Sequence, residues 1–207
     1  MEYLLILISA ILVNNVVLSQ FLGICPFLGV SKKIETAKGM GMAVIFVLVV
    51  ATIVTYLLQI YILTPFGLDY LQTIAFILVI AALVQLVEIV LKKISPALYQ
   101  ALGVYLPLIT TNCCILGVAI LVANGTYNTY TATPGLLAGV IYAVGISTGF
   151  ALALIIFAGI REQLSRVEIP KGMQGMSIAL VTAGLLAMAF MGFSGVDNGL
   201  AYLFGLK

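Results

Sequence analysis

The sequence contains no histidine and no tryptophan, and Asp, Glu, Lys and Arg together make up only 8% of its 207 residues. Without histidine, this chain alone cannot build a histidine-ligated metal or haem site. Its net charge of +2 provides no basic surface of the kind that binds nucleic acid. A glycine-rich phosphate loop within a βαβ unit is also missing, so we expect no NAD site in this chain.

Hydrophobic residues dominate what is present. They make up 63% of the chain, and the mean hydropathy is +1.26, whereas soluble domains are roughly half apolar and a quarter charged. This composition excludes a water-soluble fold and predicts an all-α integral membrane protein with one membrane domain over residues 1–207. Glu2 stands where a signal peptide would carry basic residues, so the first apolar segment is predicted to be a retained helix.

Six apolar segments are long enough to cross the ~30 Å core of a bilayer, which takes about 20 helical residues. The second is followed by Pro65 and Gly67, which indicate a turn, and the fourth by Asn124 and Gly125, which begin an uncharged polar loop. The sequence therefore predicts six transmembrane helices, over Tyr3–Val30, Met40–Leu63, Leu71–Leu91, Leu102–Ala123, Pro134–Ile160 and Met176–Phe193.

The basic residues are distributed unevenly among the loops. Loops two and four contain no Lys or Arg, whereas the other three loops hold eight of the nine basic residues of the chain, namely Lys32, Lys33, Lys38, Lys92, Lys93, Arg161, Arg166 and Lys171. Cytoplasmic loops carry the excess of Lys and Arg in membrane proteins. Loops one, three and five are therefore predicted to be cytoplasmic, with both termini on the outside.

Division of the chain near Lys93 gives two halves of three spans each. An odd number of spans per half means that the second half runs through the membrane in the opposite sense to the first. We therefore predict inverted repeats over about residues 1–93 and 94–207. In such folds, broken helices at the repeat interface are common, because protein buries their irregular backbone.

The first and fourth spans carry the residues that would break a helix. In the first, Asn14 and Asn15 precede Gly23 and the pair Cys25–Pro26, which combine a missing backbone donor with low helix propensity. In the fourth, one helix over 94–123 would be about 45 Å long, which exceeds the bilayer core. We expect there a short interfacial helix, a break near Pro107 and a buried segment that begins at Thr110.

The three cysteines are Cys25, Cys113 and Cys114. Cys25 and Cys113 each lie about 10 Å from the cytoplasmic end of their own segment at ~1.5 Å per residue, so the inverted repeat would let them face each other. Thiolates suit iron–sulfur or zinc centres, which normally need four ligands. Cys114 is about 100° away from Cys113 on a helix, so a second protein would have to complete such a site. Single cysteines in apolar helices are more often core residues, and a disulfide is disfavoured on the cytoplasmic side.

Four motifs resemble those of the RnfA/NqrE family, and in particular those of its Rnf branch, whose close relative is the E subunit of the sodium-translocating NADH:quinone reductase. They are NNVVLSQFLGICPFLGVSKK at Asn14–Lys33, LPLITTNCCILG at Leu106–Gly117, GIREQL at Gly159–Leu164 and TAGLLAMAFMGFSG at Thr182–Gly195. The resemblance covers essentially the full chain. It implies the A subunit of an Rnf electron-transport complex, a non-autonomous part of an ion-transporting ferredoxin:NAD⁺ oxidoreductase in the prokaryotic cytoplasmic (inner) membrane.

The resemblance also implies a site and partners. Cys25 and Cys113 would be two of the four ligands of an intramembrane [2Fe–2S] cluster that relays electrons, coupled to Na⁺ or H⁺ transport. The other two cysteines would come from the homologous E subunit of inverted topology, and the flavin-carrying D and G subunits would lie nearby. The family often has alanine at the position of Cys114, so Cys114 is expected to pack. No residue of this chain is expected to be catalytic.

Other readings of these residues remain open. A metal-free secondary transporter or channel subunit could use the same inverted repeat. A cation transporter usually carries a carboxylate deep in a span, and no Asp or Glu of this sequence is clearly placed there. Glu88 lies one turn from Lys92 near a helix end, so an ion pair explains it about as well as an ion site does. A scaffold with cysteines as core filler is a third reading. The polar residues beside the expected breaks could satisfy loose backbone groups or donate to cluster sulfurs; they are Asn14, Asn15, Thr110, Thr111 and Asn112. Glycine pairs such as Gly145 and Gly149 have a spacing that favours tight packing against partner subunits.

Overall fold

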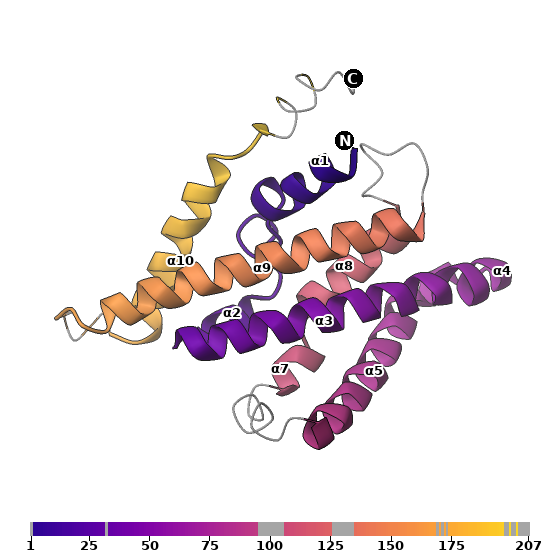
Figure 1. Cartoon of the computed structure of the whole chain (residues 1–207), viewed down its shortest axis with the longest axis horizontal. Coiled ribbons are helices and arrows are strands. Elements are labelled where there is room, and N and C mark those ends of the chain that lie inside the picture. Colours follow the sequence, from indigo (N-terminus) through magenta and orange to yellow (C-terminus); the bar gives the residue numbers. More distant parts are fainter. Residues whose placement is uncertain are drawn as a thin grey trace.

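The computed structural model describes residues 2–31, 33–94, 106–125, 135–168, 170, 172, 174–196, 199 and 202, and every regular element in them is a helix (Figure 1). The elements are α1 (Glu2–Ile8), the π-helical turn η1 (Ser9–Val13), α2 (Ile24–Val30), α3 (Ile34–Leu58), η2 (Gln59–Leu63), α4 (Thr64–Phe66), η3 (Asp69–Leu71), α5 (Gln72–Ile94), α7 (Leu106–Thr110), α8 (Cys113–Ala123), α9 (Leu136–Leu164) and α10 (Met176–Met191). The predicted all-α class is confirmed for this part of the chain.

Three of the described helices are long and apolar enough to cross a membrane, namely Ile34–Phe66, Gln72–Val90 and Leu136–Leu164. Pro107–Ala123 and Met176–Met191 are shorter apolar helices, and α10 with its 16 residues is about 24 Å long at ~1.5 Å per residue. These apolar helices are consistent with a multi-pass membrane protein. The first predicted span is divided between α1, η1 and α2.

The two longest helices, α3 and α9, lie side by side through the middle of the molecule and make its most extensive helix–helix contact (Figure 1). Small residues allow the close approach, since a Cβ atom added to Gly41 would lie only 2.9 Å from the Cβ of Ala151. Close packing of this kind associates helices in lipid, where the hydrophobic effect between helices is lost. Large side chains fill the core on either side, among them Met40, Leu48, Phe150, Leu154 and Phe157.

The first predicted span is broken, as its sequence indicated. Helix α1 passes into η1, which ends at Val13, and α2 begins only at Ile24. The break therefore precedes the Cys25–Pro26 pair. Pro26 lies in the first turn of α2. Backbone N–H groups there make no hydrogen bond within the helix, so proline, which lacks this group, is tolerated.

The fourth predicted span is also broken, but not where we expected. Pro107 lies inside the short helix α7, the break falls at Thr111 and Asn112, and α8 begins at Cys113. The expected break near Pro107 and the expected segment start at Thr110 are therefore wrong by a few residues. Proline is tolerated in the first turn of a helix, and Asn112 starts the next helix by capping it. The expected interfacial helix falls mostly on 95–105, outside the described residues.

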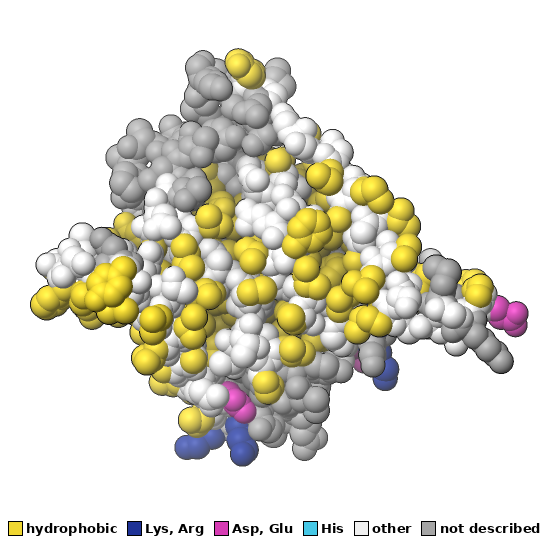
Figure 2. All heavy atoms as spheres, turned by 180° about the vertical axis from the view of Figure 1, so that it is seen from behind, with side chains coloured by type: hydrophobic (Ala, Val, Ile, Leu, Met, Phe, Trp, Pro, Cys, Tyr) yellow, Lys and Arg dark blue, Asp and Glu magenta, His cyan; other side chains and the backbone are white. Residues whose placement is uncertain are grey.

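Several helix ends differ from the predicted boundaries for identifiable reasons. Helix α4 continues past Pro65 and ends where Gly67 adopts a left-handed conformation with φ of 61°, which glycine reaches without steric cost. Helix α9 runs beyond Ile160 to Leu164, so it includes Arg161 in its last turn. On the face of the molecule in Figure 2, hydrophobic and uncharged side chains dominate, and the charged side chains lie at the margins.

Candidate metal centre at the two helix breaks

Cys25 and Cys113 occupy equivalent places in the two broken segments. Each follows a break directly, Cys25 as the second residue of α2 and Cys113 as the first residue of α8. Both side chains are exposed on the surface of the chain. Both residues therefore lie where a group, or another protein, from outside this chain can reach them.

A hydrogen bond connects the two broken segments at the cysteines. The backbone N–H of Gly23 donates to the Sγ of Cys113, with an N···S distance of 2.9 Å. Gly23 lies two residues before Cys25, and two residues of chain span at most about 7 Å. The structure thus places the sulfur of Cys113 against the turn that leads into Cys25, although the two cysteines are 88 positions apart in the sequence.

Gly23 is tightly enclosed where the two segments meet. Its φ of 79° is left-handed, and a Cβ atom added to it would lie 2.9 Å from the Phe150 ring and 3.1 Å from both the Asn112 Oδ1 and the Cys114 Cβ. On the same side, Leu22 packs so closely on α8 that a Cβ atom added to Gly117 would lie 2.8 Å from its Cδ1. Glycine at these two positions is therefore what allows the backbones of the two breaks to come together.

Asn112 is the polar residue next to Cys113, and it is only 4% exposed. Its Oδ1 accepts a hydrogen bond from the backbone N–H of Cys114 at 3.0 Å, which caps the start of α8. Its Nδ2 is buried and finds no acceptor within the described structure. A buried amide donor without an acceptor is unfavourable, so this nitrogen fits a site in which an additional acceptor is supplied.

Asn15 satisfies the backbone at the first break. Its Nδ2 donates to the carbonyl of Gly149 on α9 at 2.9 Å and to that of Ile11 at 3.3 Å, and its Oδ1 accepts from the N–H groups of Val17 and Leu18 at 3.2 and 3.4 Å. The side chain is 1% exposed. The structural interpretation of Asn15 is therefore confirmed: it replaces backbone bonds that the broken helix cannot make.

Cys114 differs from its neighbour. Its side chain is fully buried, in contact with the region around Gly23, whereas that of Cys113 is exposed. The two adjacent cysteines thus point in different directions, as their positions on one helix require. This geometry matches the packing role that we expected for Cys114.

The chain does not hold a complete metal site within its described residues, where no three His, Cys, Asp or Glu side chains lie close enough together to bind a metal ion. The three cysteines are free. Two exposed cysteines, each of which follows a helix break, fit the ligands of an iron–sulfur centre. The amide nitrogen of Asn112, which lacks an acceptor, could donate a hydrogen bond to such a centre. At most half of the usual four ligands therefore comes from here.

Two features of this region were not recognised from the sequence. Phe21 has a positive φ of 56° and is 62% exposed, an unusual combination for an aromatic residue. The sequence presents Arg161 only as a charge in a loop, yet its Nη1 donates to the carbonyl of Leu28 in α2. The one available signal was the position of Arg161 in the GIREQL motif, at the end of an apolar segment.

Comparison with known proteins gives a consistent family assignment. The family model described as "Rnf-Nqr subunit, membrane protein" matches residues 3–197. The chain is 59% identical, over 96% of its length and 100% of the relative's, to the A subunit of the Na(+)-translocating ferredoxin:NAD(+) oxidoreductase complex of Acetobacterium woodii. It is 58% identical to the A subunit of the ion-translocating oxidoreductase complex of Syntrophotalea carbinolica, over 95% of this chain and 98% of the relative, and 52% identical to that of Vibrio cholerae, over 94% and 97%.

Proposed function

This chain belongs to the Rnf-Nqr family of membrane subunits, and from that premise we propose that it is the A subunit of an ion-translocating ferredoxin:NAD⁺ oxidoreductase. In this role it is a non-autonomous part of a membrane translocase. Its own contribution is half of an intramembrane [2Fe–2S] site, formed by Cys25 and Cys113. A bound [2Fe–2S] centre supplies a one-electron carrier inside the membrane.

One observation carries this proposal, namely the hydrogen bond from the Gly23 N–H to the Cys113 Sγ. It brings the segment of Cys25 to the sulfur of Cys113 across the two helix breaks. N–H donors to ligand sulfurs stabilise the charge of a thiolate and tune iron–sulfur centres. Gly23 would serve this role for Cys113, and the unpaired Nδ2 of Asn112 provides a second donor beside it.

The proposed site needs two further sulfurs from outside the chain. Because Cys25 and Cys113 are exposed, a partner has access to each of them. We assign the remaining ligands to the homologous E subunit of inverted topology, and we place the flavin-carrying D and G subunits among the other neighbours in the complex. Coupling to Na⁺ or H⁺ transport belongs to the assembled complex.

The helix contacts support a fold of two inverted three-helix repeats. Helix α3 of the first half packs against α8 of the second, and α9 of the second half packs against α1 and η1 of the first. Each central helix also has an outer neighbour from its own half, α5 beside α3 and α10 beside α9. This exchange of equivalent contacts is what a pseudo-twofold relation between the halves would produce.

The membrane orientation is part of the proposal. Eight of the nine Lys and Arg residues lie in the predicted loops one, three and five, so we place these loops in the cytoplasm and the termini outside. The membrane itself is the prokaryotic cytoplasmic membrane, the inner membrane of cells that have two.

A metal-free transporter is the competing function. A cavity of about 340 Å³ next to the first break would be the place for a transported ion, and Asn14, Asn15, Ser19 and Ser194 contribute its polar groups. Its lining includes no Asp or Glu, whereas cation sites inside membranes usually use a carboxylate. The redox function is therefore favoured.

The experiment is a comparison of three cysteine variants in the purified complex. We expect Cys25→Ala and Cys113→Ala to abolish the signal of the [2Fe–2S] centre in electron paramagnetic resonance spectra of the dithionite-reduced complex and to lower its iron and acid-labile sulfide by two atoms each. Cys114→Ala is the matched control and should retain both. Retention of the full signal in the Cys25 and Cys113 variants would leave the metal-free transporter or the scaffold as the function.

A further inference from the structure

The short helix α2, which carries Cys25, packs against α3 and α7, and at its other end it is bonded to one side chain of α9. The Nη1 of Arg161 donates to the backbone carbonyl of Leu28 at 2.7 Å and to the Oγ of Ser31 at 2.8 Å. Leu28 is among the last four residues of α2, whose carbonyls have no partner within the helix. A cation at this position also interacts favourably with the helix dipole.

A second residue of α9 strengthens the same attachment. The ring of Phe157 stacks on that of Phe27, with ring centroids 4.4 Å apart and an interplanar angle of 16°. Phe157 lies one turn before Arg161, so both side chains leave the same face of α9, and the Arg161 guanidinium lies 5.8 Å from the Phe157 ring centroid. The contacts with Phe27 and Leu28 of α2, and with Ser31 directly after it, thus come from two positions of one helix.

These contacts matter because α2 cannot fix its own position. It has seven residues and begins after a break at a left-handed Gly23, and helices of this length have little stability of their own. Cys25 precedes Leu28 by three residues, less than one helical turn. A displacement of the Leu28 end would therefore move the Cys25 sulfur with it, whereas Cys113 is fixed separately at the start of α8.

We propose that Arg161 is a positioning residue that fixes α2 against α9 and so sets the place of the Cys25 sulfur relative to Cys113. The consequence for a metal centre rests on the proposed function, but the consequence for the two sulfurs does not. Arg161 acts on Cys25 through its bond to the backbone of α2.

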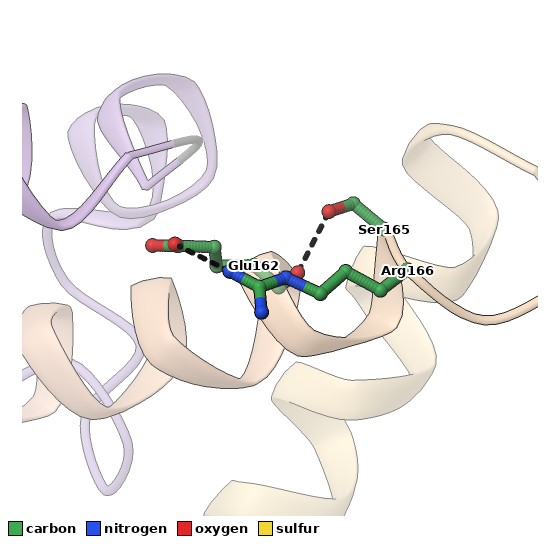
Figure 3. Close-up of polar contacts among 3 residues, drawn as sticks. All are labelled: Glu162, Ser165 and Arg166. Atoms are coloured by element: carbon green, nitrogen blue, oxygen red, sulfur yellow. Dashed lines mark hydrogen bonds and ion pairs between the residues drawn. The ribbon is translucent and has the colours of Figure 1, made fainter.

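A neighbouring arginine shows that this arrangement is specific. Arg166 lies five residues further on and is exposed. Among the described residues its side chain forms an ion pair with Glu162 at 3.6 Å, while the Ser165 hydroxyl donates to the Glu162 carbonyl at 2.7 Å (Figure 3). Exposed pairs of this kind contribute little to stability. Both arginines satisfy the charge bias of a cytoplasmic loop, but only Arg161 bonds to α2.

The test uses Arg161→Gln, Arg161→Lys and Ser31→Ala, with Arg166→Gln as the matched control. The first readout is the yield of cross-linking between Cys25 and Cys113 by a short bifunctional thiol reagent. It is measured in membranes that contain the full chain without its partner subunits, so that no cluster occupies the two thiols, and with Cys114→Ala to remove the third thiol. We expect Arg161→Gln to reduce the yield at least threefold and Ser31→Ala to reduce it less. Arg161→Lys keeps the positive charge but lacks the fork of the guanidinium, so it should recover only part of the cross-linking yield. Arg166→Gln should match the parent chain.

The second readout is the spectrum of the reduced complex, in which a displaced ligand changes the g values and line width at unchanged iron content. The proposal is overturned if Arg161→Gln leaves both the cross-linking yield and the spectrum unchanged. Should Arg161→Gln not accumulate in the membrane, Ser31→Ala decides, and an unchanged yield in that variant has the same meaning. If Cys25→Ala retains the iron, the proposed function fails, but the cross-linking yields still test the role of Arg161.

Discussion

At the scale of single residues, two asparagines perform different tasks at the two breaks. Asn15 uses both ends of its amide to satisfy backbone groups around the first break, so it has no capacity left for a ligand. Asn112 uses only its oxygen, for the Cys114 N–H, and keeps a buried nitrogen without an acceptor. The same residue type is therefore structural at the first break, and at the second it is also available to a bound group.

Gly23 is the residue whose replacement should damage the site most. Gly23→Ala would place a methyl group 2.9 Å from Phe150 and 3.1 Å from Cys114, at a left-handed φ of 79°. The left-handed backbone costs a non-glycine residue about 1–2 kcal/mol, and overpacking adds about 1–3 kcal/mol. We expect a marked fall in the thermal stability of the detergent-solubilised complex and loss of the Cys25–Cys113 cross-link.

Gly67→Ala is the control for this prediction. Gly67 has a comparable φ of 61°, but a Cβ atom added to it would meet nothing within 4 Å. This variant should therefore show only the backbone cost of about 1–2 kcal/mol and should cross-link normally. Equal loss of stability in the two variants, measured by size-exclusion chromatography after heating, would mean that the contacts around Gly23 are unimportant.

At the scale of helices, the glycines of α9 explain how the first broken segment is held. A Cβ atom added to Gly145 would lie 2.9 Å from the Cβ of Ala10, and one added to Gly149 would lie 3.0 Å from the carbonyl oxygen of Ile11. The sequence predicted close packing at this pair, but against partner subunits. In the structure these glycines instead contact α1 and η1 of the same chain. The carbonyl of Gly149 also accepts a hydrogen bond from Asn15, directly after η1.

Substitutions at two glycines of α9 should have opposite effects. In Gly149→Ala, the new methyl group meets backbone atoms of Ile11, which cannot move without displacing η1, so we expect destabilisation of about 1–3 kcal/mol. Gly159→Ala adds a methyl group with nothing within 4 Å and gains up to about 1 kcal/mol of helix propensity. Thermal stability of the solubilised complex measures both. A Gly149 variant as stable as the Gly159 variant would contradict the packing that we describe.

The sequence predicted the helical elements better than the details of the two breaks. Hydrophobic periodicity and length depend on local composition, so α5 and α9 lie where expected within a few residues. Helix α3 begins six residues before the predicted start at Met40 and includes Lys38, which was predicted to lie in loop one. At the fourth span the prediction from Pro107 is wrong, because this proline lies in the first turn of α7. The break is defined by Asn112, which caps α8. The role of Arg161 was not predictable, since its acceptor is a backbone carbonyl 133 positions away and any residue type at position 28 would present one.

At the scale of the whole molecule, the two halves depend on each other for their stability. Neither broken segment packs mainly within its own half: α8 lies against α3, and α1 with η1 lies against α9. The candidate site forms where these exchanged segments meet, at Gly23 and Cys113. A change in the relation between the halves would therefore alter the distance between the two cysteines, which connects the fold as a whole to the proposed redox role.

The orientation of the whole molecule in the membrane yields the last prediction. Lys and Arg are concentrated in loops one, three and five, and positive loops remain in the cytoplasm. We expect a cysteine introduced by Glu168→Cys, beyond the end of α9, to be cytoplasmic and one introduced by Asn124→Cys, at the end of α8, to face outward. Both positions are exposed, so a membrane-impermeant maleimide applied to intact spheroplasts should label Asn124→Cys several-fold faster than Glu168→Cys.

The parent chain, with its three native cysteines, provides the background labelling for this experiment. Inverted membrane vesicles should reverse the order, and permeabilised cells should remove it. Faster labelling of Glu168→Cys than of Asn124→Cys in spheroplasts would place the basic loops outside and overturn the orientation. It would also move Cys25 and Cys113, which lie toward the basic end of their segments in the predicted topology, from the cytoplasmic half of the membrane to the outer half. Electrons from cytoplasmic ferredoxin would then have to cross most of the bilayer before they reached the proposed centre.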